Sequence, residues 1–571
     1  MTIASRAEEG RNTDFLIGNA VLIASFLGAS LLVFFGIATK QISQFIYFTI
    51  DLPAFCAVGL IAALSTAFYY TNPRWPAWAN RRHLLQIKPW HLALVTLIAI
   101  AAAIGPVYHG FALSMDEHMT RFQAAVFRAG HLAGEVPPAW RFVGHALYNI
   151  YAVYDGQSGH VYGLWRPGMA ALYALFDLVG LGRYTSAVMS AGSVILVASV
   201  ARLLWPRSDS APIVAALLVA TSQQVLFTGL TAYAMPAELF FNLLWLRLFL
   251  ADRPWAHVLA ALVGVATAAL HHVHTHLFFA APFLLTLFRP FRPWLIAWYG
   301  TTYLLGHASI IGWDQIALGA AAGEHRFAAR VASYFEPPGL FQFSTLFALL
   351  VRWIAWQNLA VVPLVAIAIR RAQWSTPLRL MGVSIALSVV PSLFFMPDQG
   401  YGWGYRYLHG LIGNLSLIAT AGWLEVEKMG ADDRRRICAS LAAAGILSIS
   451  LMLPLRAVQV EALVAPHARA EQYIRSMPDD VVVIDAPAIY YGHDLVRNDA
   501  FVRNRPVILN MYHLNMAQIQ RLCAAHPHSV RLVGAGDLTR FGLLKRDHPR
   551  FPPPDWQAMR AQLKAPPCAG R

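Results

Sequence analysis

The sequence predicts an all-α polytopic membrane domain of about 13 transmembrane helices over residues 1–456, followed by an extracytoplasmic α/β domain over 457–571. The chain of 571 residues is 57% hydrophobic and only 13% charged, with a mean hydropathy of +0.48. Soluble domains, by contrast, carry about 25% charged residues. Apolar runs of about 20 residues, long enough to cross a bilayer, recur through the first part of the chain. Basic residues gather in the short segments between alternate runs.

The predicted spans and the basic segments alternate in a way that sets an orientation. Spans are expected at 14–38, 50–70, 90–108, 185–205, 211–230, 232–250, 255–271, 277–289, 294–312, 345–369, 379–396, 409–425 and 437–456. The basic segments are 72–90, 202–210, 247–255, 289–294, 370–379 and 427–436. Because Lys and Arg are enriched in cytoplasmic loops, these segments and the N-terminus are expected in the cytoplasm. The polar N-terminus lacks a cleavage site, so the first run should remain a helix.

The long segments between spans then all lie outside the cytoplasm. They are 109–184, 313–344, 397–408 and the tail after 456. Since binding and catalytic residues concentrate in long loops, we expect any chemistry on the outer side. ATP and nucleotide sugars are not available there. An activated substrate would therefore arrive attached to a lipid.

The tail differs in kind from the rest of the chain. Residues 479–487, 505–513 and 529–536 have the pattern of buried strands, and 467–477 and 515–526 that of helices. Of the four cysteines, Cys523 and Cys568 would face an oxidising compartment, where a disulfide could hold the Pro-rich end. Spacing alone does not decide that pairing. The net charge of +14 resides mainly between spans, so we do not expect nucleic-acid binding.

The clearest chemical signal is the sequence Ser-Met-Asp-Glu directly after the third apolar run. Ser114 and Glu117 have the spacing of a capping box, and Asp116 falls in the first turn, where the helix dipole favours an ionised carboxylate. Both acids could simply cap an interfacial helix. Alternatively, Asp116 lies at the mouth of a membrane cavity and accepts a proton from an acceptor hydroxyl.

A second signal is a cluster of histidines between two short apolar runs. His271, His272, His274 and His276 lie where a helical hairpin should turn below the outer surface, beside a polar cavity. On a helix, His271 and His274 would share one face and His272 and His276 another, which allows a metal pair. No third ligand accompanies either pair. Metal binding, phosphate or sugar contact and ordinary structural hydrogen bonding all stay open for this cluster.

A third signal is the Gly-rich aromatic segment 396–410, which enters the twelfth predicted span. Tyr405 and its neighbouring aromatic residues offer faces for sugar or prenyl contact, and Arg406 and His409 add positive charge at the membrane surface. An aromatic belt with a snorkelling arginine is the alternative. An arginine can anchor a phosphate through two parallel hydrogen bonds.

An external acidic pair after an early span, then an amphipathic helix and a helix opening with Pro-Gly, resembles the GT-C superfamily of membrane glycosyltransferases. Protein O-mannosyltransferases, lipid A aminoarabinose transferases and bacterial membrane mannosyl- and galacturonosyltransferases look similar. The resemblance implies that Asp116 is the catalytic base with Glu117 as its neighbour. It implies, more loosely, a substrate-binding role for Arg166 beside Pro167. It also favours Arg406 as a phosphate anchor, whereas the hairpin that carries Lys or Arg in relatives has histidines here.

The sequence therefore predicts a multi-pass glycosyltransferase of a bacterial inner membrane, with a cytoplasmic N-terminus. It would move a sugar, with inversion, from a polyprenyl-phosphate donor to a glycan, lipid or protein acceptor, in contact with membrane lipids. No cofactor is expected, although a divalent metal at the histidines stays open. A lipid-glycan flippase or transporter and a non-catalytic scaffold of envelope assembly are the alternatives. A flippase would need charged residues spread through the spans, and few lie outside the site.

Overall fold

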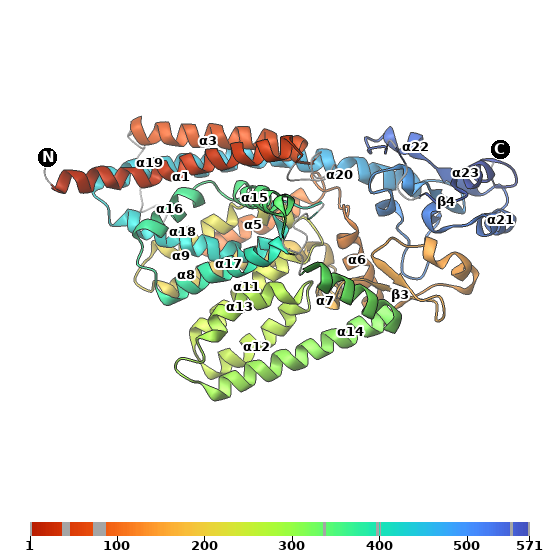
Figure 1. Cartoon of the computed structure of the whole chain (residues 1–571), viewed down its shortest axis with the longest axis horizontal. Helices are drawn as coiled ribbons and strands as arrows, with labels where there is room; N and C mark the ends of the chain where they lie inside the picture. The colour runs from red at the N-terminus through yellow and green to blue at the C-terminus, as the bar shows by residue number, and fades with distance from the viewer. Residues whose placement is uncertain are drawn as a thin grey trace.

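The computed structural model describes residues 3–36, 46–71, 87–334, 338–394, 399, 401–546, 548 and 552–568. Most of the predicted basic segment 72–90 and part of 397–408 lie outside the described residues. The N-terminus and the C-terminal sheet lie at opposite ends of the long axis, with the helical part between them (Figure 1). The described residues also form two three-stranded sheets, one antiparallel and one parallel, and both lie toward the C-terminal end (Figure 1).

Five helical stretches of the described residues are long and apolar enough to cross a membrane. They are α1 (Ile3–Phe34, apolar from Leu16), η1 with α3 (Tyr47–Asp51, Leu52–Thr71), η4 with α8 (Gly182–Tyr184, Thr185–Leu204), α17 with η5 (Thr376–Val389, Val390–Leu393), and α19, η7 and α20 (Ala431–Leu447, Ser448–Met452, Leu453–Arg475). Shorter apolar helices are α5 (Pro89–Ala103), α9 (Ser210–Ala220), α12 (Pro254–Ala268), α13 (Val273–Leu285) and α15 (Leu340–Ala355). The protein is thus multi-pass, but the predicted number of about 13 spans is not confirmed among the described residues.

The predicted spans at 211–230 and 345–369 are each broken into two helices. The first forms α9 and α10 (Gln223–Thr228), and the second forms α15 and α16 (Val361–Arg371). The breaks lie against each other, because the N–H of Gln224 donates to the carbonyl oxygen of Trp356 at 2.9 Å. Backbone groups freed inside an apolar environment need such partners, so two matched breaks are tolerated where one alone would be costly.

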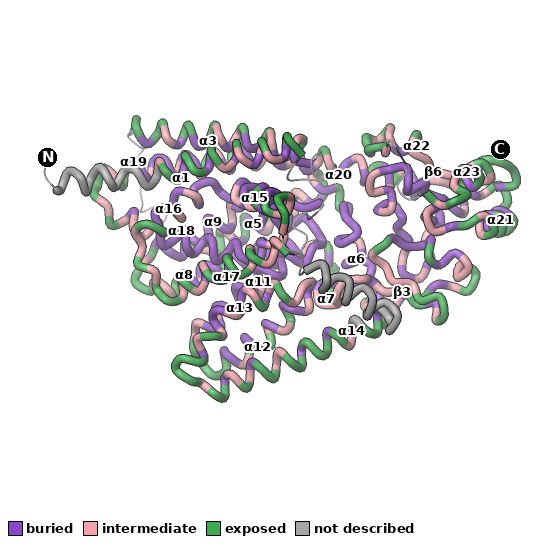
Figure 2. The backbone as a smooth tube through the Cα atoms, in the orientation of Figure 1, coloured by how far each residue is buried: buried purple, intermediate pink, exposed green. Residues whose placement is uncertain are grey.

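The remaining helices of this part complete the bundle. They are α11 (Met235–Ala251), α14 (Pro293–Tyr334) and α18 (Ile412–Glu427). Buried residues line the inside of the bundle, and exposed residues run along the outer side of α12 and the described part of α14 (Figure 2). Large apolar side chains such as Val21, Leu27 and Leu31 of α1 are exposed, as a lipid-facing surface requires.

The predicted first external loop, 109–184, folds into a small substructure. It contains α6 (Met115–Arg128), η3 (Pro138–Ala146), α7 (Pro167–Asp177) and an antiparallel sheet of order β1-β3-β2 (Gly134–Glu135, His160–Gly163, Ala152–Tyr154). The start of α7 packs closely on the end of α12, because the N–H of Gly168 donates to the carbonyl oxygen of Ala269 at 3.0 Å. A Cβ at Gly168 would lie only 2.6 Å from that oxygen. Glycine therefore allows the approach.

The tail has the predicted strands and helices. Strands β4 (Val481–Ile484), β5 (Val507–Asn510) and β6 (Val530–Val533) form a parallel sheet of order β5-β4-β6, accompanied by α21 (Met516–Ala525), α22 (Ala535–Thr539) and α23 (Trp556–Lys564). All four residues of β4 and of β5 are buried, as expected of a parallel sheet covered on both faces. Cys523 and Cys568 form a disulfide, so the pairing that spacing left open is present and ties the last described segment to α21.

The first loop and the tail share one hydrophobic core. Phe122 and Val126 of α6 pack in the same buried cluster as Val481, Leu509 and Leu522 of the tail. In addition, α20 runs without interruption through residue 457, from the bundle to the sheet. The two regions that the sequence assigns to different domains are therefore one packed unit at the end of the bundle.

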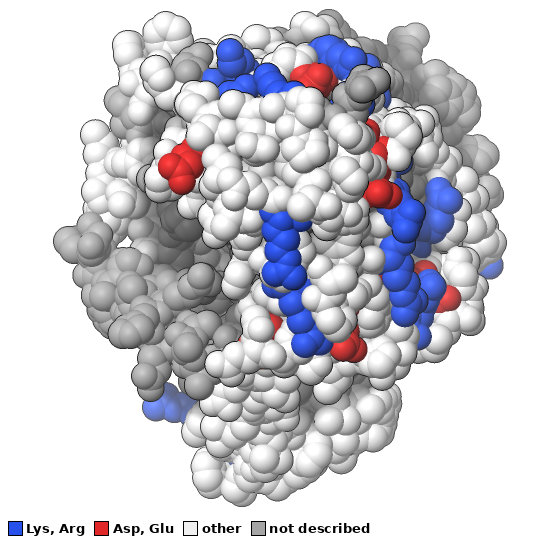
Figure 3. All heavy atoms as spheres, turned by 90° about the vertical axis from the view of Figure 1, so that its right-hand side faces the viewer, with Lys and Arg blue, Asp and Glu red and all other residues white. Residues whose placement is uncertain are grey.

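The surface at this end carries charges of both signs. Figure 3 shows Lys and Arg side chains in several strips, with Asp or Glu beside most of them.

Candidate active site

Asp116 lies in the first turn of α6, where the first loop meets the bundle. Ser114 is the N-cap of α6, and its hydroxyl oxygen accepts a hydrogen bond from the N–H of Glu117 at 3.4 Å. This confirms the predicted N-cap. The reciprocal half of the capping box is not formed, because the Glu117 side chain points elsewhere.

Glu117 is fully buried and joins two other segments. Its Oε1 accepts from the hydroxyl of Tyr108 at 2.8 Å, and its Oε2 accepts from the N–H of Ala232 at 3.0 Å. Burial raises the pKa of the Glu117 carboxyl, and these two hydrogen bonds oppose the rise. Of the two alternatives for Glu117, simple capping of an interfacial helix does not describe its contacts, because its carboxylate is buried and accepts from Tyr108 and Ala232.

Asp116 forms an ion pair with Arg406, which comes from a segment 290 residues further along the chain. Arg406 Nη1 donates to Asp116 Oδ2 at 2.5 Å, and the two side chains are 11% and 10% exposed. The Arg406 guanidinium also lies 5.2 Å from the ring centre of Tyr233 and 5.4 Å from that of Tyr407. An arginine of an aromatic belt would extend to the interface. This one is instead directed inward, onto the predicted catalytic carboxylate.

The segment that carries Arg406 is held by side-chain amides. Gln399 Oε1 accepts from the N–H of Arg406 at 2.7 Å, and Gln224 Nε2 donates to the carbonyl oxygen of Tyr405 at 2.9 Å. Gln357 Nε2 in turn donates to Gln224 Oε1 at 3.1 Å. The two helix breaks described above therefore supply the polar groups that fix the backbone beside Arg406.

A buried ion pair supports the same segment from the bundle side. Arg352 Nη2 donates to the carbonyl oxygen of Gly402 at 2.9 Å. Its Nε lies 3.3 Å from Asp51 Oδ2, and both side chains are buried. Removing either partner of a buried pair leaves an unpaired charge, which costs several kcal/mol. Arg352 is therefore held firmly where it supports the carbonyl oxygen of Gly402.

Arg166 and His271 lie together around Trp165. The rings of Trp165 and His271 stack at 4.5 Å, and Arg166 Nη1 donates to the carbonyl oxygen of His271 at 3.1 Å. His272 lies between Trp165 and Tyr407, at 6.1 and 6.3 Å from their ring centres. These contacts make the histidine turn continuous with the Arg406 segment.

The expected helical spacing of the histidines is wrong for the first two. His271 and His272 precede α13, and His272 has extended backbone as its N-cap, because the chain turns here between α12 and α13. His274 is exposed and stacks on His272 at 5.1 Å. Among the described residues, no group of three or more His, Cys, Asp or Glu side chains is placed to hold a metal ion.

Three other predicted residues lie inside the bundle. His276 bridges Asn242 and Tyr303 through its two ring nitrogens, each at 2.8 Å, which is a structural arrangement. His409 and Tyr405 are fully buried. In the described part of the chain, the ring nitrogens of His409 have no hydrogen-bond partner.

No protein-family model matches the chain, and no curated protein matches it by sequence. The chain is similar in structure to ArnT from Cupriavidus metallidurans bound to undecaprenyl phosphate, with 11% identity over 79% of this chain and 90% of that chain and a TM-score of 0.49. It is also similar to the Archaeoglobus fulgidus oligosaccharyltransferase in complex with Zn and sulfate (12% identity, 72% and 62% covered, TM-score 0.38). A third similar structure is the arabinosyltransferase EmbB from Mycobacterium smegmatis (13% identity, 71% and 45% covered, TM-score 0.40).

At identities of 11% to 13% and TM-scores of 0.38 to 0.49, neither activity nor substrate follows from the likeness. The proposed function below therefore rests on the geometry of the site.

Sequence reasoning missed several residues that complete the site. Gln224 and Gln357 interrupt apolar runs, and polar residues inside a predicted span are a signal that could have marked them. Trp165 and Tyr151, whose rings stack at 5.5 Å, carry no such signal. Asp494 of the tail is also part of this region. Burial raises the pKa of Asp494 to about 8, Arg497 opposes the rise and Asp116 adds to it.

Proposed function

We propose that this chain is a membrane glycosyltransferase that transfers a sugar, with inversion, from a polyprenyl-phosphate donor to an extracytoplasmic acceptor. The observation that carries the proposal is the nearly buried Asp116–Arg406 pair. Transfer from a lipid phosphate needs a group that accepts a proton and a cation that stabilises the leaving phosphate. Here the two lie within hydrogen-bonding distance of each other.

The step uses the two side chains in different roles. The acceptor hydroxyl oxygen attacks the anomeric carbon on the face opposite the phosphate, and its proton passes to Asp116. The bond between the anomeric carbon and the phosphate oxygen breaks, and its electron pair leaves on that oxygen. The products are the inverted glycoside and the polyprenyl phosphate. Arg406 stabilises the charge that builds up on the leaving oxygen.

The free edge of Arg406 suits a phosphate. Nη1 is bound to Asp116, whereas Nε is buried and, among the described residues, has no hydrogen-bond partner. A phosphate that takes this edge would receive parallel hydrogen bonds, the arrangement in which arginine binds oxyanions best. Both ring nitrogens of His271 are likewise buried without a described partner. We assign His271, His272 and Arg166 to contact with the donor.

No cofactor is needed for this reaction, because a phosphate monoester is a good leaving group. We place the site on the outer face of a bacterial inner membrane, where the acceptor is a glycan, a lipid or a protein. Undecaprenyl phosphate, which is bound in the similar ArnT structure, is a suitable probe for the donor lipid.

The test is chemical analysis of surface glycans from a strain that lacks this protein. Wild type should restore the missing sugar, as should Asp155→Asn, which alters an exposed first-loop carboxylate that accepts from the N–H of Gln157 at 2.9 Å. Asp116→Asn keeps the side-chain size but should lower product about 100-fold or more at equal protein level. Full complementation by Asp116→Asn would contradict the proposal and would favour a flippase or a scaffold.

A further inference from the structure

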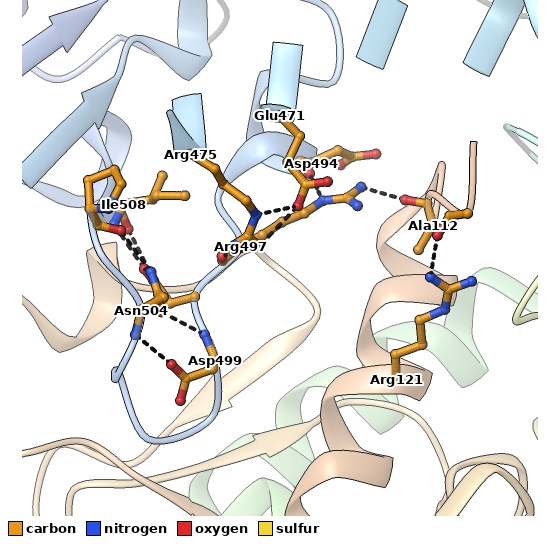
Figure 4. A network of polar contacts seen from close by, with 12 residues as sticks. Ala112, Arg121, Glu471, Arg475, Asp494, Arg497, Asp499, Asn504 and Ile508 are labelled. Carbon is orange, nitrogen blue, oxygen red and sulfur yellow. Dashed lines mark hydrogen bonds and ion pairs between the residues drawn. The ribbon is translucent and has the colours of Figure 1, made fainter. Parts of the chain in front are cut away.

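One turn of the tail contacts the segment that leads into α6. The turn follows β4 and includes η9 (Gly492–Leu495). Arg497 Nη2 donates to the carbonyl oxygen of Ala112 at 2.5 Å, and the guanidinium lies 4.0 Å from the ring centre of Phe111. Figure 4 shows Arg497 extending to Ala112 while Arg121 of α6 reaches the same segment from the other side. The backbone just before Asp116 is thus held by the tail.

The same turn also contacts the segment that carries Arg406. The rings of Tyr491 and Tyr401 lie 4.3 Å apart. The carbonyl oxygen of Tyr401 accepts from the hydroxyl of Tyr233 at 3.1 Å, and the Tyr233 ring lies under Arg406. The turn therefore contacts the backbone that leads to Asp116 and also the segment that leads to Arg406.

The turn is itself anchored in three places. Asn498 Nδ2 donates to the carbonyl oxygens of Ile508 in β5 and Leu147 in the first loop, each at 2.6 Å. Arg475, near the end of α20, donates to the carbonyl oxygen of Arg497 at 3.2 Å (Figure 4). Sheet, first loop and α20 all hold it, so it has little freedom to move independently.

We propose that the turn formed by residues 491–498 is a positioning element that fixes Asp116 relative to Arg406, with Arg497 as its principal residue. This inference rests on the proposed function. Ala112 and Tyr401 lie outside regular helix or strand. The backbone that leads to each charged residue is therefore not fixed there by the repeating hydrogen bonds of a helix or sheet. Placement errors of about 1 Å cost catalysis about 100-fold. The C-terminal domain is therefore part of the site and not an attachment to it.

The test compares two arginine substitutions across the same interface. Arg497→Met keeps an apolar stem on Phe111 but loses the hydrogen bond to Ala112. The matched control is Arg521→Met. Arg521 is also a tail arginine that packs on an aromatic ring of the first loop, with its guanidinium 4.2 Å from the ring centre of Phe142. Glycan product is measured in the strain complemented with each variant. Each variant is also purified as the full chain, and binding of undecaprenyl phosphate, thermal stability and hydrogen exchange of residues 108–118 are measured on it.

We expect Arg497→Met to lower product about tenfold or more at equal amounts of folded protein and to raise exchange at 108–118, with binding of undecaprenyl phosphate unchanged and only the loss of thermal stability that the missing buried hydrogen bonds cause. Arg521→Met should match wild type in all four measurements, and Arg497→Lys should recover part of the product. Wild-type product and exchange in Arg497→Met would overturn the inference. So would a loss of product that merely follows a loss of stability. Asp116→Asn is measured in parallel: if it keeps its product, the proposed function fails, while the exchange result still decides the positioning.

Discussion

The Nε2 of Gln224 donates to the carbonyl oxygen of Tyr405 at 2.9 Å, so a break in one membrane helix holds the backbone one residue before Arg406. The two residues are 181 positions apart in the chain, and Gln357 at the second break holds the Gln224 amide by donating to its oxygen at 3.1 Å. The consequence is that the geometry of Arg406 depends on backbone conformation next to it.

Gly404→Ala tests that dependence. Gly404 has a φ of +65°, and a Cβ there would lie 2.4 Å from Gln224 Oε1. A left-handed alanine costs about 1–2 kcal/mol, and the contact would also displace the amide that holds Tyr405. We expect product to fall about tenfold in the glycan assay with little change in protein level. Gly430→Ala is the control, since nothing lies within 4 Å of its Cβ position; equal product in both variants would contradict this view of the loop.

Arg406→Lys tests phosphate binding. Lysine keeps the charge but cannot give two parallel hydrogen bonds, so affinity for undecaprenyl phosphate and glycan product should fall together, each about tenfold or more. The measurement is titration of the reconstituted protein with undecaprenyl phosphate. Arg183→Lys, at an arginine 5.0 Å from the ring centre of Tyr184, should be silent. If Arg406→Lys binds and transfers as wild type does, the arginine is only a packing residue.

Glu117 separates buried hydrogen bonding from catalysis. Glu117→Gln can still accept from the N–H of Ala232 and can donate to the oxygen of Tyr108, so product should stay within about tenfold of wild type. Glu117→Leu leaves both groups without an acceptor and should lower the free energy of unfolding by about 1–3 kcal/mol. Thermal unfolding of the purified variants measures this. A loss of product in Glu117→Gln as large as that in Asp116→Asn would instead make both acids catalytic.

Asp494 should make stability depend on pH. Its pKa is raised from 3.8 to about 8 in the folded protein, so the native state keeps a proton that the unfolded chain releases. Wild type therefore loses stability as the pH rises from about 4 to about 8, by at most about 1.4 kcal/mol for each step of one in pH. Asp494→Asn cannot ionise, so its stability relative to wild type should increase across that window. Thermal unfolding against pH measures the difference, with Asp555→Asn at an exposed carboxylate as control; a constant difference between Asp494→Asn and wild type would refute the prediction.

The orientation in the membrane is tested by reporter fusions. Fusions after residues 80, 290 and 430 should report cytoplasm, because basic loops stay on that side, and fusions at 150, 330 and 500 should report the outer side. Residue 80 lies outside the described residues. A cytoplasmic reporter at 500 would remove the argument for a lipid-linked donor, since nucleotide sugars are available on that side.

The sequence by itself determined the features that depend on local composition and spacing. Long apolar runs predict membrane helices, because crossing the bilayer takes about 20 consecutive apolar residues. Ser114 was predictable as an N-cap because capping involves residues three apart. The strands of the tail were predictable because buried strands form short, continuous apolar runs bounded by turn residues.

Only the tertiary structure decided which residues far apart in the sequence contact each other. Asp116 and Arg406 pair across 290 residues, and no local pattern encodes a partner at that distance. Polar residues mark the breaks at Ser222 and Trp356 in the sequence, but no local pattern shows that the two breaks lie against each other and share a backbone hydrogen bond. Arg497 reaches Ala112 because the first loop and the tail bury one common hydrophobic core. Which segments share a core depends on how the chain packs and not on their distance in the sequence.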